Sequence, residues 1–161
     1  MQDLREAADI DGAVHALYAR YAEAICDGRL EEWPDFFTDV CLYKVISRAN
    51  QERNLPLAPI FSETKGGLID RVRAVRTALV YAPRSVCYVV GTIGISERTR
   101  DGVRARSMFS AYHTFVEGDS GLLMCGRTFD RIVRDGASLK FTERIVVYDN
   151  ERVPSALVYP L

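Results

Sequence analysis

The sequence predicts an α+β fold in which a long, curved antiparallel sheet wraps around helices from the N-terminal half. Two observations carry this prediction. Apolar residues recur at helical spacing in the first half of the chain, whereas the second half consists of four strand-like runs separated by short polar turns. Helices that precede an antiparallel meander in this way gather on one face of its sheet. A twisted sheet that curls around such helices makes a cone with one open end.

A long amphipathic helix is expected first, and Asp27-Gly28 supplies its stop signal. Its apolar positions are Ile10, Val14, Leu17, Tyr18, Tyr21 and Ile25. A second, short helix is expected in LEEWPDFF, because Pro34 is tolerated only in a first turn and acidic residues favour that end of a helix. Three aromatic side chains should pin this helix over the mouth of the cone and start the first strand: Trp33, Phe36 and Phe37.

The segment from Val40 to Arg48 suits a strand. The polar stretch RANQERNLPLAP after it is expected to be a loop that leads to a short extended segment around Ile60. A third helix follows, with Gly66-Gly67 at its entrance and Pro83 after its end. Its apolar stripe consists of Leu68, Val72, Val75 and Leu79.

Four long antiparallel strands are expected in the remainder of the chain, because RDG, GDS and DGAS are hairpin turn signals between strand-like runs. The runs cover residues 85–99, 103–117, 121–134 and 139–148. Gly91, in GTIGIS, lies inside the first run, where a glycine marks a bulge or a bend. No repeat or linker interrupts the chain, so residues 1–161 are expected to form a single domain.

Strict alternation assigns the side chains of these strands to two faces. On the second strand, the face expected to pack on the helices carries Val103, Ala105, Ser107, Phe109, Ala111, His113 and Phe115. Its opposite, outer face carries Arg104, Arg106, Met108, Ser110, Tyr112, Thr114 and Val116. The same rule groups on one face of the third strand Arg127, Phe129, Arg131 and Val133. On one face of the last strand it groups Lys140, Thr142, Arg144, Val146 and Tyr148.

The mixture of Arg, Tyr, Met and Phe on the outer face resembles a protein interface more than a solvated sheet. A solvated face on which long Arg stems lie over apolar neighbours is the alternative. The apolar stretch VPSALVYPL favours the interface, since so hydrophobic an end of a chain is usually docked on something.

The composition excludes several classes of function. Twenty-one basic and 22 acidic residues give a net charge of -1, so there is no electrostatic case for nucleic acid or an anionic membrane. The stretch MQDLREAADIDG lacks the apolar core of a signal peptide, and no run approaches a membrane-spanning length. Four widely spaced cysteines without a C-x-x-C pair suggest neither zinc nor redox chemistry, and are expected to be reduced and mostly buried. A cytoplasmic location is expected.

Groups able to perform catalysis are scarce. His15 lies on the first helix and His113 in the middle of a strand, so they cannot supply the two convergent histidines of a mononuclear iron site. The one enzymatic option is acid-base catalysis in the mouth of the cone, by His113 with Asp130 near it on the next strand and Tyr18 or Tyr21 from the first helix. A histidine satisfied within the core, and an aspartate paired with neighbouring arginines, are the alternatives.

These residues leave three classes of function open: a partner subunit, a stand-alone isomerase or dehydratase, and a ligand-binding or transport-adaptor module without chemistry. The first is favoured, because the chain is poor in catalytic groups and rich in residues suited to contact across a sheet face. No catalytic, cofactor-binding or metal-binding residue is therefore assigned.

Several stretches together resemble the small, or β, subunit of the Rieske-type aromatic-ring-hydroxylating oxygenases. They are YAEAICDGRLEEWPDFFTDVCLYKV, LIDRVRAVRTALVYAP, YVVGTI, CGRTFDRIVRDGASLKFTERIVVYDN and VYPL, which span nearly the whole chain in order. Within that family the sequence is most similar to small subunits that serve aromatic carboxylic acids, the salicylate 5-hydroxylase and terephthalate dioxygenase types.

The resemblance implies a cone of the NTF2-like (cystatin-like) kind. It also implies a hexamer of three large and three small subunits, in which the large subunit carries a Rieske two-iron two-sulfur cluster and a mononuclear iron. Electrons would come from NADH through a reductase and sometimes a ferredoxin. A Rieske cluster needs two Cys and two His in paired motifs, which this chain lacks. The implied role of the chain is therefore structural, with catalysis in the large subunit.

Overall fold

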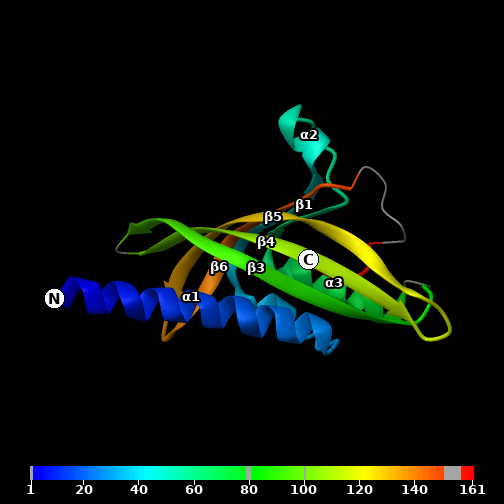
Figure 1. Ribbon diagram of the computed structural model, residues 1–161, viewed down its shortest axis with the longest axis horizontal. Helices are drawn as coiled ribbons and strands as arrows, with labels where there is room; N and C mark the ends of the chain where they lie inside the picture. The colour runs from blue at the N-terminus through cyan, green and yellow to red at the C-terminus, as the bar shows by residue number, and fades with distance from the viewer. Residues whose placement is uncertain (1, 79–80, 100, 151–156) are drawn as a thin grey trace.

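A curved sheet with two long helices packed against one of its faces forms the body of the molecule (Figure 1). The computed structural model describes residues 2–78, 81–99, 101–150 and 157–161, with side chains from residue 9 onward. The helices are α1 (Gln2–Cys26), the 3-10 helix η1 (Trp33–Phe36), α2 (Arg48–Glu52) and α3 (Lys65–Thr77). The strands are β1 (Phe37–Ser47), β2 (Ile60–Thr64), β3 (Arg84–Thr99), β4 (Gly102–Phe115), β5 (Ser120–Asp135) and β6 (Ser138–Tyr148).

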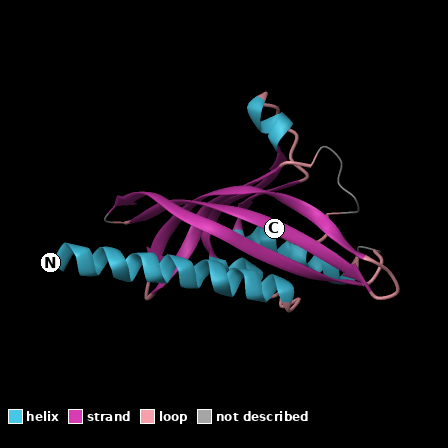
Figure 2. Cartoon of the chain, in the orientation of Figure 1, coloured by secondary structure: helices cyan, strands magenta, loops and turns pink. Residues whose placement is uncertain are grey.

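The six strands follow one another across the sheet in the order β2-β1-β6-β5-β4-β3. Every neighbouring pair is antiparallel except β1 and β6, which run parallel. Figure 2 shows α1 lying along one side of the sheet, while the short α2 projects from the other side. The α+β cone predicted from the sequence, with its meander of four long strands, is confirmed.

The first helix forms as predicted, because its apolar stripe faces the sheet. The residues of this stripe that are almost completely buried are Val14, Leu17, Tyr18, Tyr21 and Ile25. Gly28 follows the helix in the left-handed region, at φ 67°, which favours glycine and turns the chain away. The next short helix is a 3-10 helix with Pro34 in its first turn; its first residue, Trp33, and the residue after it, Phe37, are buried. Phe36 is half-buried against the same core.

The loop predicted from Arg48 onward is wrong for its first five residues, which form α2. The Ser47 hydroxyl accepts a hydrogen bond at 3.2 Å from the Asn50 backbone N–H and so caps this helix. None of the α2 residues is buried, so the helix has no apolar stripe that periodicity could detect.

The third helix begins after Thr64, whose hydroxyl accepts a hydrogen bond at 3.1 Å from the Gly67 backbone N–H. Its predicted stripe is confirmed at Leu68, Val72 and Val75, which are buried. Leu79, the fourth predicted member, lies outside the described residues. The helix ends at Thr77, ahead of Pro83.

Alternation predicts the two faces of β4 correctly. Its inward side chains, from Val103 to His113, are buried, whereas Arg104, Arg106, Met108 and Tyr112 are exposed. The bulge expected near Gly91 is also present, because the pairing of β3 with β4 shifts register between Val90 and Ile93.

The alternation predicted for the last strand is wrong after its first residues. Asp130 lies opposite Arg144, whereas Ile132 lies opposite Phe141, so β6 contains one residue more than β5 in this stretch. Such a bulge reverses the facing of every later side chain. Arg144, Val146 and Tyr148 therefore point into the core, although strict alternation groups them with the half-exposed Lys140 and Thr142.

Candidate functional site

Asp130 is held at the centre of the cone by groups from three elements. The Tyr18 hydroxyl on α1 donates a hydrogen bond to its Oδ2. The Thr128 hydroxyl donates to the same oxygen at 2.5 Å, and the Arg144 Nη1 does so at 3.1 Å. Ser107, at 2.9 Å from Thr128, extends the chain of hydrogen bonds to β4. The Asp130 and Arg144 side chains are completely buried, so this carboxylate is a structural tie between α1, β5 and β6.

Aromatic rings and a second set of hydrogen bonds surround Arg144. Its guanidinium carbon lies 4.3 Å from the ring centroid of Tyr21 and 4.8 Å from that of Phe141, which are cation-π distances. Its Nη2 donates to the Tyr88 hydroxyl at 3.0 Å, and its Nε reaches the main-chain oxygen of Leu161 at 3.5 Å. The guanidinium is therefore enclosed by aromatic rings and hydrogen-bond acceptors of the core.

Residues 157–161 complete this interior arrangement. The Tyr21 and Tyr43 hydroxyls donate to the main-chain oxygen of Leu161 at 2.8 and 3.1 Å, and the Leu161 N–H donates to the Tyr43 oxygen at 2.8 Å. Trp33 donates its indole N–H to Tyr21 at 3.0 Å. Arg71 on α3 adds a bond at 3.0 Å to the Leu157 oxygen. The apolar stretch is therefore docked at residues 157–161, but on the core of its own chain, so its use as support for a subunit interface is wrong for these residues. Residues 153–156 lie outside the described part.

The electrostatics of this interior are dominated by the loss of water. Burial raises the pKa of Asp130 above its ordinary value, and the Arg144 guanidinium and the Thr128 and Tyr18 hydroxyls oppose that rise. Burial, together with the Asp130 charge, raises the pKa of Tyr18, so this phenol stays neutral and acts as a donor. For Arg144, burial favours the neutral form, but Asp130 and the surrounding tyrosines outweigh it and raise the pKa well above its ordinary value. The guanidinium is therefore always charged.

A raised pKa would suit a general acid or base, but the Asp130 carboxylate is buried and already hydrogen-bonded. A catalytic carboxylate must lie within hydrogen-bond reach of a substrate atom. Asp130 Oδ2 already accepts from Tyr18, Thr128 and Arg144, and the carboxylate is sealed from solvent. Its Oδ1 finds no partner among the described residues and is equally buried.

The predicted approach of His113 to Asp130 is wrong. Both residues face the core, but His113 pairs with Gly121, whereas Asp130 pairs with Ala105. Ala105 and His113 lie eight residues apart on β4, which at ~3.3 Å per residue separates the two groups by roughly 26 Å. His113 instead packs against Phe115, with ring centroids 4.7 Å apart. Tyr18 is the only predicted partner that contacts Asp130, since the Tyr21 hydroxyl bonds to Leu161 instead.

Sequence reasoning missed Arg144 because it assumed that alternation continues through the last strand. The sequence of the strand gave no clear signal for the bulge. Leu139 and Phe141 are apolar at odd positions, but the run IVVY at residues 145–148 is apolar at odd and even positions alike. Alternation therefore cannot assign the facing of side chains after Glu143.

Cysteines and possible metal ligands are not gathered at one place in the part of the chain that the structure describes. In the described ranges, no three side chains of His, Cys, Asp or Glu come together as metal ligands. The four cysteines form no disulfide; Cys41 is buried, Cys26 and Cys125 are half-buried and Cys87 is exposed, so the prediction that most are buried is wrong. None of the helices in the described part combines the length and the apolar character needed to cross a bilayer.

The outer face of the sheet, opposite α1 and α3, exposes large side chains instead. Its exposed apolar and aromatic residues are Val89, Met108, Tyr112, Leu122 and Phe129. In the strand pairing Tyr112 lies opposite Leu122, while Phe129 lies opposite Arg106 and Met108 opposite Arg127. Solvated strands normally carry polar or charged residues on the water side, so this composition supports the interface, which stays a prediction.

The family model described as "Ring hydroxylating beta subunit" matches residues 20–155, which is most of the chain. The chain belongs to the ring-hydroxylating β subunit family. The small subunit of anthranilate 1,2-dioxygenase from Burkholderia cepacia is 26% identical over 161 residues, the whole of both chains. The subunit beta 1 of the terminal oxygenase component of terephthalate 1,2-dioxygenase from Comamonas sp. is 25% identical over 148 residues, 92% of this chain and 96% of its own.

A solved structure gives the same assignment. The β subunit of an inferred aromatic-ring-hydroxylating dioxygenase from Novosphingobium aromaticivorans superposes with a TM-score of 0.88 at 31% identity. The match covers 96% of this chain and 99% of that one. The family, the predicted NTF2-like cone and the role of small subunit in a ring-hydroxylating dioxygenase are therefore confirmed.

Proposed function

We propose that the chain is the structural β subunit of a multicomponent Rieske oxygenase that hydroxylates an aromatic carboxylic acid. The observation that carries the structural role is the sealed Asp130–Arg144 pair, whose side chains are both inaccessible to solvent and so to a substrate. The names of two relatives contain anthranilate and terephthalate, which are both aromatic carboxylates. These names support an aromatic carboxylic acid as the substrate. No residue of this chain is given a catalytic, metal-binding or cofactor-binding role.

The reaction would take place in a large, or α, subunit. That partner would hold a Rieske cluster and a mononuclear iron, and electrons would reach it from NADH through a reductase and, in some systems, a ferredoxin. The chain would contribute surfaces that hold three large and three small subunits together in the cytoplasm, with residues 1–161 acting as a single unit. The exposed apolar and aromatic side chains of the outer face support an interface of this kind.

The alternative of a stand-alone isomerase or dehydratase finds less support. It would use Asp130 or His113 as the acid-base group, and the register of β4 and β5 holds these residues too far apart to act together. Asp130 makes no hydrogen bond with His113, because its Oδ2 accepts from Tyr18, Thr128 and Arg144 instead.

Purification of the tagged chain from its native host tests the proposal directly. Native mass spectrometry of the eluate should show three plus three chains, and the complex should contain iron and acid-labile sulfide. A colourless, iron-free monomer or dimer would contradict the proposal. As a second test, Asp130→Asn in the assembled complex should retain turnover of the aromatic acid in proportion to the hexamer that forms. Loss of turnover in a fully assembled hexamer would indicate that Asp130 takes part in catalysis.

A further inference from the structure

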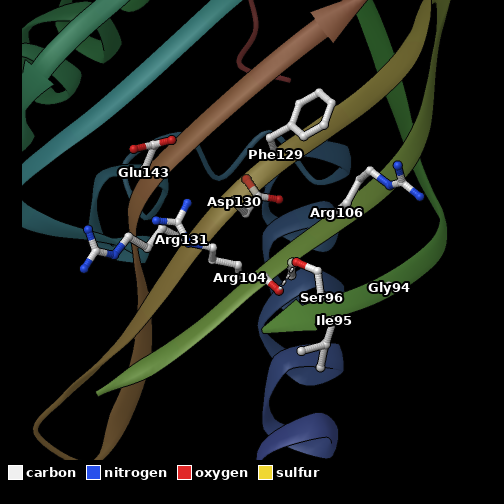
Figure 3. A pocket seen from close by; sticks show the side chains of 10 residues that line it. Gly94, Ile95, Ser96, Arg104, Arg106, Phe129, Asp130, Arg131 and Glu143 are labelled. Carbon is white, nitrogen blue, oxygen red and sulfur yellow. Dashed lines mark hydrogen bonds between the residues drawn. The ribbon is translucent and has the colours of Figure 1, made fainter. Parts of the chain in front are cut away.

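A groove of about 530 Å³ crosses the outer face of the sheet where β3, β4, β5 and β6 lie side by side (Figure 3). Arg106 stands on one side of it, and Arg104 and Arg131 stand on the other, with Phe129 and Glu143 along the rim. The groove therefore combines three guanidinium groups with an aromatic ring on one continuous surface.

Two features accompany this hollow: a glycine without a side chain, and irregular pairing of two strands. Gly94 lies opposite Arg106 in the strand pairing, and a Cβ built on it would meet nothing within 4 Å, so the floor is open there. The register of β3 shifts between Ile95 and Glu97, and that of β6 shifts beside Glu143. Bulges of this kind re-aim side chains and bend their strands. The groove is consequently built into the strand pairing.

The charges of the groove are only partly compensated. Arg104 makes an ion pair with Glu97 at 3.0 Å. Arg106 and Arg131 have no ion-pair partner among the described residues, even though Glu143 lies opposite Arg131 in the strand pairing. Arg127, which is half-buried on the same face, adds a further positive charge next to Met108. The surface is cationic, while the chain as a whole carries a net charge of -1.

We propose that this groove receives an acidic segment of the large oxygenase subunit, whose carboxylates pair with Arg106 and Arg131 and whose neighbouring apolar side chain packs on Phe129. This inference rests on the proposed function, and it adds that the part of the large subunit in the groove is acidic. Arg and aromatic residues dominate the energetically important positions of interfaces, and the planar guanidinium binds a carboxylate through two parallel hydrogen bonds. Phe129 is 41% exposed, which leaves it available to a partner.

Charge also decides against a two-fold contact in which this groove meets the same groove of a second copy. In a two-fold contact the same patch meets itself, so Arg106 and Arg131 would face the arginines of the other copy. Like charges brought together across an interface cost several kcal/mol. A partner surface rich in Asp or Glu removes this penalty.

The test compares two charge-reversal variants in reconstitution with the tagged large subunit of the same host. The groove variant is Arg106→Glu with Arg131→Glu. The control is Arg20→Glu with Arg53→Glu, which makes the same change of charge at two exposed arginines on α1 and after α2. Circular dichroism should show both variants folded. The groove variant should bind the large subunit at least about tenfold more weakly than the control, a difference of about 1.4 kcal/mol or more. Arg106→Gln with Arg131→Gln should fall between them.

Three other results would contradict the inference, the proposed function, or both. If wild type, control and groove variant bind the large subunit equally, the inference is wrong and the proposed function stands. If even the wild type binds no large subunit, the proposed function itself fails, and the inference with it. If the chain alone forms oligomers that the groove variant abolishes, the occupant is a second copy, which also overturns the inference. Raising the salt concentration should weaken the wild type more than the groove variant, because exposed ion pairs are screened.

Discussion

Asp130 and Arg144 face each other across the β5–β6 pairing, with 3.1 Å between carboxylate and guanidinium and no access of solvent to either side chain. A bulge in β6 produces this relationship, since without the extra residue Arg144 would point to the outer face. An arginine on that face would join Arg106 and Arg131 there. Inside, it closes the cone around Tyr18, Tyr21 and Tyr88.

Removing one partner of this pair should be far more damaging than removing both. Arg144→Leu leaves the Asp130 carboxylate buried without its counter-charge, so the free energy of unfolding should fall by about 3–5 kcal/mol. The double variant Arg144→Leu with Asp130→Leu should recover a large part of this loss. Urea denaturation of the three proteins measures the difference. A single variant within about 1 kcal/mol of wild type would show that the pair contributes little.

The contact between Tyr43 and Leu161 should contribute measurably to stability. Tyr43→Phe removes a hydroxyl that both donates to and accepts from the Leu161 backbone. Because both backbone groups are buried there, the loss should cost about 1–3 kcal/mol. Tyr112→Phe is the matched control: its hydroxyl lies on the exposed outer face, so thermal denaturation should show almost no change. Equal melting temperatures for the two variants would contradict the assigned role of residues 157–161.

Gly126 should tolerate no side chain. A Cβ at this position would lie 2.1 Å from the backbone oxygen of Val147 on β6, and backbone cannot move aside as a flexible side chain can. Gly126→Ala should therefore lower the free energy of unfolding by about 1–3 kcal/mol or more. Gly94→Ala serves as the control, since a Cβ there meets open space. Denaturant titration of both variants checks the prediction, and similar midpoints would argue against the β5–β6 register described above.

The ion pair between Glu31 and Arg76 should make stability depend on acid pH. Hydrogen bonds from Arg76 at 2.7 and 2.9 Å hold the pKa of Glu31 at about 2, below its ordinary 4.5. A depressed carboxylate pKa stabilises the fold above pH 4.5, and this contribution is lost as the pH falls from 4.5 toward 2. Both groups are exposed, so the effect should stay below about 1 kcal/mol.

Stability measured from pH 6 to pH 2 should therefore fall less steeply in Glu31→Gln than in wild type. Glu52→Gln, an exposed glutamate on α2, is the control and should follow the wild-type curve. A Glu31→Gln curve parallel to that of wild type would show that the pair does not survive in solution.

A helix or strand of this fold could be predicted where its buried apolar residues recur at regular spacing. The apolar positions of α1 and α3 repeat at helical spacing, and the inner residues of β4 alternate without interruption, so local periodicity was enough. The short α2 buries nothing and left no such pattern. The aromatic cluster was also predictable in part: Trp33 and Phe37 pin η1 to the core, with Trp33 lying 5.0 Å from the ring centroid of Tyr43.

The sequence by itself determined the family, the order of helices and strands apart from α2, and the outward facing of Arg106 and Phe129. Only the tertiary structure decided that Arg144 turns inward to meet Asp130, that His113 lies far from both, and that Leu161 closes the interior. The reason is physical. Periodicity is a property of one segment, whereas a bulge and a strand register are set by hydrogen bonding to a neighbouring strand. Distances between strands depend on that pairing, so the sequence of one strand cannot reveal them.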